Sequence, residues 1–204
     1  MITLNLFNRR SFNSDRINYI CKNNSLIMKK EILLSLVLFM VGFTVYSQEN
    51  SSKVKWYTIE EALKLNEQNP KKIFIDVYTD WCGWCKTMDK NTFSNPQIAE
   101  YLNTYYYPVK FNAESSKEIT YKGVVYKNQG TGNRSTHDFA AAILNGRLSY
   151  PSAVYMDGQN NLLTAVPGYY APADIEPILV FFAENYYKTI KWEDFRAKFV
   201  SKLK

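Results

Sequence analysis

Residues 72 to 85 constrain the fold of this chain more than any other segment. Lys72 to Thr79 is an almost unbroken run of β-branched and aromatic side chains, which is typical of a strand buried on both faces. Cys82 and Cys85 follow directly, in the sequence Trp-Cys-Gly-Trp-Cys, at the expected start of a helix. The segment therefore predicts a strand in a parallel sheet, a short turn, and a helix that begins at a pair of cysteines.

This placement of the cysteines has a chemical consequence. A helix N-terminus presents free N–H groups and a partial positive charge, which favour a thiolate at Cys82. Cys85 lies one turn further on and within reach. Such a pair can attack a foreign disulfide through Cys82 and release the mixed disulfide when Cys85 attacks in turn. Helix geometry predicts an exposed Cys82 and an inward Cys85, so Cys82 should be alkylated first.

Other uses of a Cys-x-x-Cys motif fit less well. A structural zinc ion needs four ligands, and residues 48 to 204 offer two cysteines and the single His137, so we expect no metal and no cofactor. Haem attachment needs histidine where Lys86 stands. An inert structural disulfide stays open as an alternative, although it would close only a four-residue loop. We interpret His137, on an alanine-rich helix, as structural or solvent-facing.

The N-terminal segment indicates export. Residues 28 to 47 begin with Met-Lys-Lys, continue with an apolar run from Ile32 to Val45, and end on the small residue Ser47, which is the pattern of a cleaved signal peptide. The run is shorter than the roughly 20 residues needed to cross a bilayer. Residues 1 to 27, which contain Cys21, are interpreted as an upstream extension from a misassigned start. Residues 48 to 204 then form one domain.

The net charge gives no support for a nucleic-acid partner. The chain of 204 residues carries +6. Six of its 25 basic and two of its 19 acidic side chains lie in residues 1 to 47, which leaves only +2 for the remainder.

Capping and turn signals divide the remainder into elements. Thr58 and Glu61 form a capping box before a first helix, and Asn95-Pro96 opens another. Ser135 is the expected cap of a helix that runs through Leu144. The other predicted elements are a helix from the cysteines to about Asn91, strands at 106–112, 153–156 and 162–166, a hairpin within 117–129 around Lys122-Gly123, and helices at about 173–186 and 192–203.

The segment Phe74 to Lys86 resembles the active-site segment of the thioredoxin family. Asp89 to Pro96, which reads DKNTFSNP, is particularly similar to the C-terminal thioredoxin domain of the bacterial transmembrane thiol:disulfide interchange proteins. The similarity extends over roughly residues 56 to 186. It implies an α/β thioredoxin-like fold, with a central mixed sheet flanked by helices. The hairpin insertion and the extra C-terminal helix predicted above are departures from the family pattern. Trp84 departs from the family, since thioredoxin itself has proline there.

The resemblance also implies roles for individual residues. Asp76 would be buried, with a raised pKa, and would accept the proton of Cys85; the alternative is a strand aspartate that points at a turn or at solvent. Lys110 in the adjacent strand would pair with Asp76. Pro151 would form a cis peptide bond and leave the preceding backbone free to pair with substrate. Substrate contacts would come from Trp81, Gly83, Trp84, Tyr150 and Pro151.

These inferences predict an exported thiol:disulfide oxidoreductase that is periplasmic or secreted in a bacterium. Its partners would be proteins bearing disulfides, and a membrane thiol carrier would supply electrons. Gly83-Trp84 adds no positive charge between the cysteines, and Asp76 and Asp80 disfavour the thiolate, which predicts a reductase rather than a strong oxidant. The alternative is a thioredoxin-like protein-binding module with a non-catalytic disulfide.

Overall fold

The computed structural model describes residues 53–132 and 134–203, and the predicted upstream extension and signal peptide lie outside them. Its main sheet has the strand order β2-β1-β5-β6. Strand β1 (Lys72–Tyr78) is parallel to β2 (Tyr106–Asn112) and antiparallel to β5 (Ser152–Met156), which pairs antiparallel with β6 (Leu162–Pro167). The parallel sheet predicted from the apolar run is therefore wrong for β5, because burial on both faces does not fix the direction of a neighbouring strand. The mixed sheet implied by the family resemblance is confirmed.

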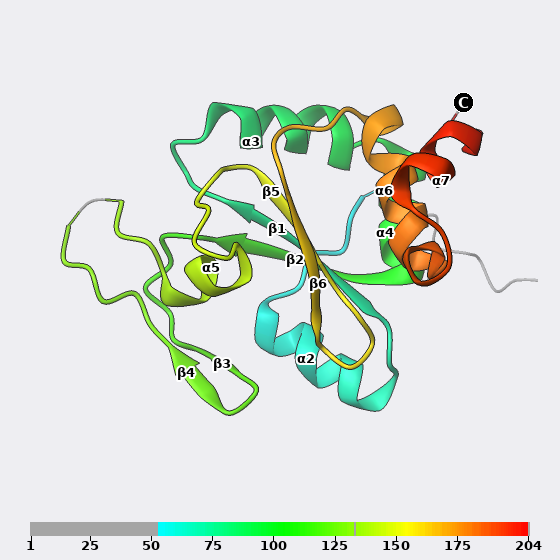
Figure 1. Cartoon of the computed structure of the whole chain (residues 1–204). Helices are drawn as coiled ribbons and strands as arrows, with labels where there is room; N and C mark the ends of the chain where they lie inside the picture. Colours follow the sequence, from blue (N-terminus) through cyan, green and yellow to red (C-terminus); the bar gives the residue numbers. More distant parts are fainter. Residues whose placement is uncertain (1–52, 133, 204) are drawn as a thin grey trace, which may run out of the picture. The chain divides into compact units, whose positions relative to one another are not determined.

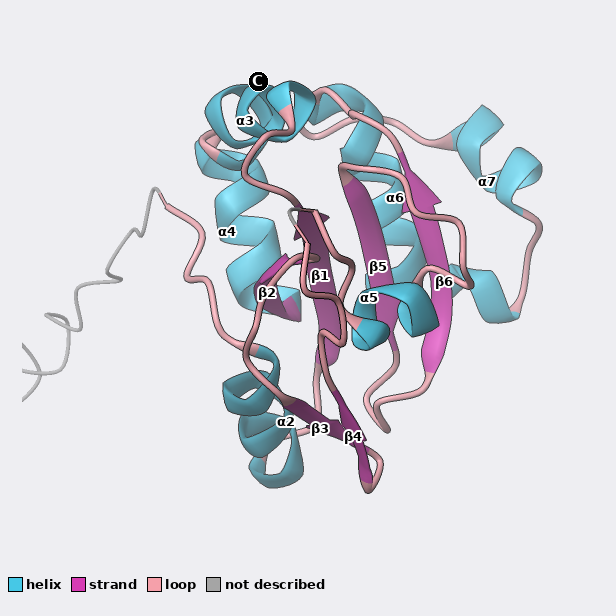
Figure 2. Cartoon of the chain, turned by 90° about the vertical axis from the view of Figure 1, so that its left-hand side faces the viewer, coloured by secondary structure: helices cyan, strands magenta, loops and turns pink. Residues whose placement is uncertain are grey.

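Helices cover both faces of this sheet (Figures 1 and 2). Helices α2 (Ile59–Gln68) and α5 (Asp138–Ile143) pack on one face. Helices α3 (Gly83–Met88), α4 (Pro96–Tyr105) and α6 (Pro172–Ala183) pack on the other. The remaining helical segments are the π-helical turn η1 (Asp89–Phe93), the 3-10 turn η2 (Tyr186–Lys188) and α7 (Trp192–Lys198). None of the helices within these described ranges combines the length and apolar character needed to span a membrane.

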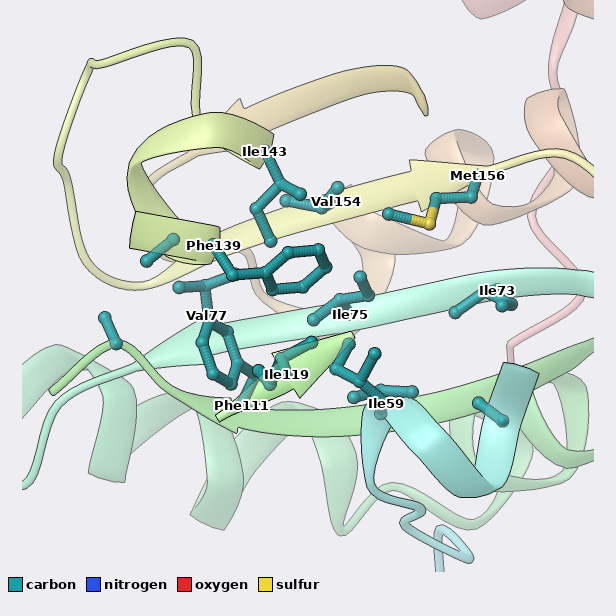
Figure 3. Packing of buried hydrophobic residues seen from close by; sticks show 14 of the residues in the cluster. Ile59, Ile73, Ile75, Val77, Phe111, Ile119, Phe139, Ile143, Val154 and Met156 are labelled. Atoms are coloured by element: carbon teal, nitrogen blue, oxygen red, sulfur yellow. The ribbon is translucent and has the colours of Figure 1, made fainter. Parts of the chain in front are cut away.

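Strand β1 contributes side chains to both cores. Ile73, Ile75 and Val77 join the cluster under α2 and α5 (Figure 3), whereas Phe74 joins the cluster with α3, α4 and α6. Because side chains alternate along a strand, Asp76 lies on the same face as Phe74. The carboxyl group is thereby placed on the side of the sheet that carries α3.

The predicted cap at Thr58 and the predicted helix start at Pro96 are confirmed, with Asn95 as the cap of α4, but Ser135 is not the cap of α5. That cap is His137, which is fully buried; its Nδ1 accepts the N–H of Phe139 at 3.0 Å and its Nε2 lies 2.9 Å from the carbonyl oxygen of Lys117. The ring therefore carries its proton on Nε2. His137 is structural, and the solvent-facing interpretation is wrong because the insertion covers the ring. The last two helices also end earlier than expected, at Ala183 and Lys198.

We expect His137→Ala to lower the free energy of unfolding by about 2 to 3 kcal/mol, because it removes a helix cap and the hydrogen bond to Lys117 and leaves a cavity in place of a fully buried ring. Urea denaturation measures the change. His137→Asn keeps a capping oxygen and should lose less. A loss below about 0.5 kcal/mol for the alanine variant would contradict the structural role, since that is the level of ordinary surface substitutions.

The predicted hairpin insertion is confirmed as β3 (Ile119–Tyr121) and β4 (Val124–Tyr126). Its two-residue turn is Lys122-Gly123, and both residues have positive φ, which suits a tight hairpin and favours glycine. Tyr121 fastens the hairpin to the domain, because its hydroxyl donates to the carbonyl of Asn160 and its ring packs against Phe139. The insertion is thus a fixed part of the domain.

Candidate active site around a cysteine pair

The two cysteines form a disulfide at the start of α3. Cys82 is the N-cap residue, and its Sγ accepts the N–H of Cys85 at 3.0 Å. The Cα atoms of Cys82 and Cys85 are 5.3 Å apart. The expectation that Cys82 is exposed is wrong in this oxidised form, in which Cys82 is 5% and Cys85 2% exposed. The disulfide and the Cys85 N–H together draw the Cys82 sulfur into the first helical turn.

Aromatic side chains surround this disulfide. Trp81 and Trp84 are 49% and 64% exposed, which is unusual for side chains of their size. The ring of Trp81 packs edge-on against that of Tyr150, with 6.1 Å between the ring centroids. The ring centroids of Trp84 and Tyr169 are 5.4 Å apart. The structure thus brings together Trp81, Trp84 and Tyr150 as expected, and it adds Tyr169. Gly83, the first residue of α3, borders open space.

The loop before β5 lies at the same end of the sheet. The Tyr150–Pro151 peptide bond is cis, as expected. Ser152 pairs with Val77, near the end of β1 that leads to the cysteines. The loop, the two indoles and the disulfide therefore share one edge of the domain.

Trp81 is fixed by two residues that the sequence reasoning missed. Its indole Nε1–H donates to the Oε1 of Glu114 at 2.8 Å, and the guanidinium of Arg134 lies 4.8 Å from its ring. Glu114 follows β2, and Arg134 belongs to the segment after the hairpin. No local pattern in the sequence links either residue to Trp81, because both contacts depend on how the insertion folds back.

The carboxyl group of Asp76 is buried on the face of the sheet that carries α3, and it pairs with Lys110. Lys110 Nζ lies 2.5 Å from Asp76 Oδ2 and also forms an ion pair with Asp89. Burial raises the pKa of Asp76 from its ordinary 3.8 to about 6, although the Lys110 ammonium opposes this shift. Burial lowers the pKa of Lys110, but Asp76 and Asp89 outweigh that effect and leave it raised.

This arrangement excludes the alternative of a solvent-facing strand aspartate. Asp76 is 1% exposed, and its Oδ1 is buried without a hydrogen-bond partner among the described residues. The carboxyl group thus keeps one oxygen able to accept a proton. Asp89, which the sequence reasoning missed as a partner of Lys110, stands four residues after Cys85, and that one-turn spacing is a signal that could have identified it.

A four-stranded mixed sheet covered on both faces by helices, with a Cys-Gly-Trp-Cys pair where β1 leads into a helix, defines a thioredoxin-like protein. The family model Thioredox_DsbH, described as protein of unknown function DUF255, matches residues 44–176. The chain belongs to this family.

Relatives of known sequence include the thiol:disulfide interchange protein DsbD. DsbD of Escherichia coli (strain K12) is 34% identical over 65 residues, which are 31% of this chain and 12% of DsbD. DsbD of Haemophilus ducreyi is 44% identical over 41 residues, 20% of this chain and 7% of that protein. An uncharacterized protein of Archaeoglobus fulgidus is 31% identical over 86 residues, 42% of this chain and 67% of that protein. The chain thus matches only a small part of DsbD.

Two of the solved structures that are similar to this one have low sequence identity to the chain. DsbH oxidoreductase is 18% identical, with 65% of this chain and 85% of that chain covered and a TM-score of 0.46. A thioredoxin-fold protein from Helicobacter pylori is 20% identical, with 64% and 80% covered and a TM-score of 0.48.

Proposed function

We propose that this protein is an exported thiol:disulfide oxidoreductase that reduces protein disulfides. The observation that carries the proposal is the Cys82–Cys85 disulfide at the start of α3, on the side of the sheet where Asp76 is buried with a pKa of about 6. In the reduced protein the Cys82 thiolate attacks one sulfur of a substrate disulfide, and the other substrate sulfur leaves as a thiolate. A mixed disulfide then joins Cys82 to the substrate.

The second step needs a thiolate at Cys85. Asp76 takes the Cys85 proton, and the resulting thiolate attacks Cys82 Sγ, which breaks the mixed disulfide. The substrate leaves with both sulfurs reduced, and the protein keeps the Cys82–Cys85 disulfide. Each turnover therefore moves two electrons from the cysteine pair to the substrate, and a thiol donor must return them.

The two residues between the cysteines support the reductase direction. No positive side chain lies between the cysteines, since residues 83 and 84 are glycine and tryptophan. Without a positive side chain there, the Cys82 thiolate of the reduced form is less stabilised. The disulfide form is therefore comparatively stable. The apolar run of residues 32 to 45 supports export, and the partial similarity to the transmembrane protein family supports a membrane thiol carrier as electron donor.

The reduction potential tests the direction of electron flow. We expect equilibration with a glutathione redox buffer to give a value near the roughly −270 mV of thioredoxin rather than the roughly −120 mV of a strong oxidase. A potential above about −150 mV on that scale would assign the protein to the oxidases instead. Thiol alkylation followed by mass spectrometry reports the oxidised fraction directly.

A thioredoxin-like binding module with an inert disulfide is the second candidate. It is favoured by one observation: Val124 and Val125 of the hairpin are 52% and 50% exposed, in addition to the two exposed indoles. Cys82→Ala separates the candidates. Unchanged partner capture and unchanged biological effect in that variant would favour the binding module, whereas their loss supports the enzyme.

A further inference from the structure

Strand β6 forms a free edge of the main sheet. It pairs with β5 on one side, and no other described strand lies beside it (Figure 2). Gly168 donates its N–H to the carbonyl of Pro151 at 2.8 Å. Because hydrogen-bonded pairs alternate in an antiparallel ladder, Val166 directs its backbone groups toward β5, and Ala165 directs its N–H and C=O outward. Ala165 thus offers one unpaired donor and one unpaired acceptor at the edge.

Two hollows lie along this strand, one for each face of the sheet. The first, of about 490 Å³, lies between β6, α6 and α7, and Val166 is among its lining residues. The second, of about 640 Å³, lies between β6 and the loop after α5, and Ala165 lines it. Their positions follow the alternation of side chains along the strand. A second strand laid against β6 would direct its own side chains alternately toward the two hollows.

The hollows differ in character. The first is rich in aromatic rings, including Tyr169, Phe181 and Trp192, and its two charged lining residues, Asp174 and Arg196, are of opposite sign. The second contains Arg147, and no acidic residue lines it. The first therefore suits a large apolar side chain, and the second suits an acidic one.

This edge is continuous with the cysteine site. Pro151, which accepts the Gly168 N–H, follows Tyr150, the residue whose ring contacts Trp81. On the other side, Tyr169 lines the first hollow and contacts Trp84, which stands between the two cysteines. A polypeptide whose disulfide meets Cys82 can therefore continue directly onto β6.

We propose that the free edge of β6 binds an extended segment of the disulfide-bearing substrate polypeptide by strand addition. The main chain of the segment pairs with Ala165, and its side chains alternate between large apolar residues at Tyr169 and acidic residues at Arg147. An extended polypeptide can pair with the free donor and acceptor of Ala165 and fill the hollows on both faces of the sheet at once, which a small molecule cannot do. This inference rests on the proposed function and adds to it a substrate-binding surface and a preference for certain substrate side chains.

The wild-type protein tests the proposal without any variant. Peptides with a cysteine at one end, disulfide-linked to a small thiol and followed by alternating phenylalanine and glutamate, serve as substrates. A matched set carries N-methyl groups on alternate backbone nitrogens, in both registers. We expect N-methylation in one register to lower kcat/KM about tenfold, the effect of losing one or two hydrogen bonds, and the other register to change it little. Equal rates for all peptides would overturn the proposal.

Variants locate the effect on β6. Ala165→Pro removes the outward N–H, and proline at such a position is tolerated on an edge strand. We expect the ratio of kcat/KM for the peptide to that for a small aromatic disulfide to fall about tenfold, while Ala165→Ser keeps the ratio. Arg147→Glu should reverse the preference for glutamate over lysine in the peptide.

Other outcomes are also decisive. Reduction of the small disulfide without any peptide preference leaves the proposed function intact and refutes the edge, whereas no reduction of either substrate refutes the proposed function. If a second copy of the chain occupies the edge, gel filtration shows a dimer that Ala165→Pro dissociates, and the substrate proposal is wrong.

Discussion

Cys82→Ser is expected to slow the reduction of a peptide disulfide at least about a thousandfold. A free thiol with a pKa near 8.5 supplies some thiolate at neutral pH, whereas a serine hydroxyl supplies no comparable nucleophile. The initial rate with dithiothreitol as electron donor measures the loss. Among the described residues Cys85 is the other thiol, and it is less exposed than Cys82. Residual activity above a tenth of wild type would show that Cys82 is not the attacking residue.

Lys90→Ala is the matched control for this variant. Lys90 is exposed in η1, directly after α3. Its replacement by alanine removes a charge without changing the cysteines or the Asp76–Lys110 pair. We expect this variant to keep the wild-type rate. A comparable loss in Lys90→Ala would mean that disturbance of the helical segment, rather than loss of the thiol, explains the result for Cys82→Ser.

Asp76→Asn is expected to gain about 3 kcal/mol in free energy of unfolding, relative to wild type, as the pH rises from 3.8 to about 6. The folded-state pKa of Asp76, about 6, lies above its ordinary 3.8 because the carboxyl is buried. The folded protein therefore binds this proton more tightly than the unfolded chain. The associated stability is fully present below pH 3.8 and is lost as the pH rises to about 6. Relative to wild type, the asparagine variant should gain stability over that window.

Urea denaturation of both oxidised proteins from pH 3.5 to pH 7 measures this difference. Asp157→Asn is a control of opposite sign. Burial tends to raise the pKa of Asp157, but hydrogen bonds from Asn161 and Gln159 outweigh it, so the pKa is lowered. The free energy of unfolding of wild type should therefore rise relative to that of Asp157→Asn as the pH rises. A constant difference between wild type and Asp76→Asn would show that Asp76 does not titrate as a buried group.

The same variant should separate the two chemical steps. Without the carboxylate of Asp76, deprotonation of Cys85 loses its base, so release of the mixed disulfide should slow about a hundredfold. The first attack by Cys82 should be less affected. Stopped-flow measurement with a chromogenic disulfide resolves the steps, and equal slowing of both would indicate a purely structural Asp76.

Local patterns in the sequence predicted much of the fold. The bounds of β2 and the hairpin turn at Lys122-Gly123 are as expected, because a run of aromatic and apolar residues and a positive-φ turn depend on near neighbours. The cap of α5 was misassigned for the same reason. Ser135 fits the usual preference, but a hydrogen bond to the Lys117 carbonyl, 20 residues away from His137, holds the histidine at the cap position instead.

The candidate site was predictable where the chain itself carries the geometry. The Asp76–Lys110 pair follows from two adjacent strands in register, and the indoles beside the disulfide follow from Trp81 and Trp84 within the motif. The contacts of Glu114 and Arg134 with Trp81 could not be predicted, since they depend on the tertiary position of an insertion. The burial of Cys82 was also missed, because the first helical turn encloses a sulfur that simple helix geometry leaves outside.

Trapping of the mixed disulfide tests the central claim, attack through Cys82 and release through Cys85, most directly. Reduced Cys85→Ser protein is mixed with a peptide disulfide, quenched with acid, and analysed by mass spectrometry under non-reducing conditions. The mechanism predicts a one-to-one adduct on Cys82 that persists, whereas wild type releases it and Cys82→Ser forms at most about a hundredth as much in the same time. An adduct on Cys85 in the Cys82→Ser protein, formed as fast as the adduct on Cys82, would contradict this order of attack.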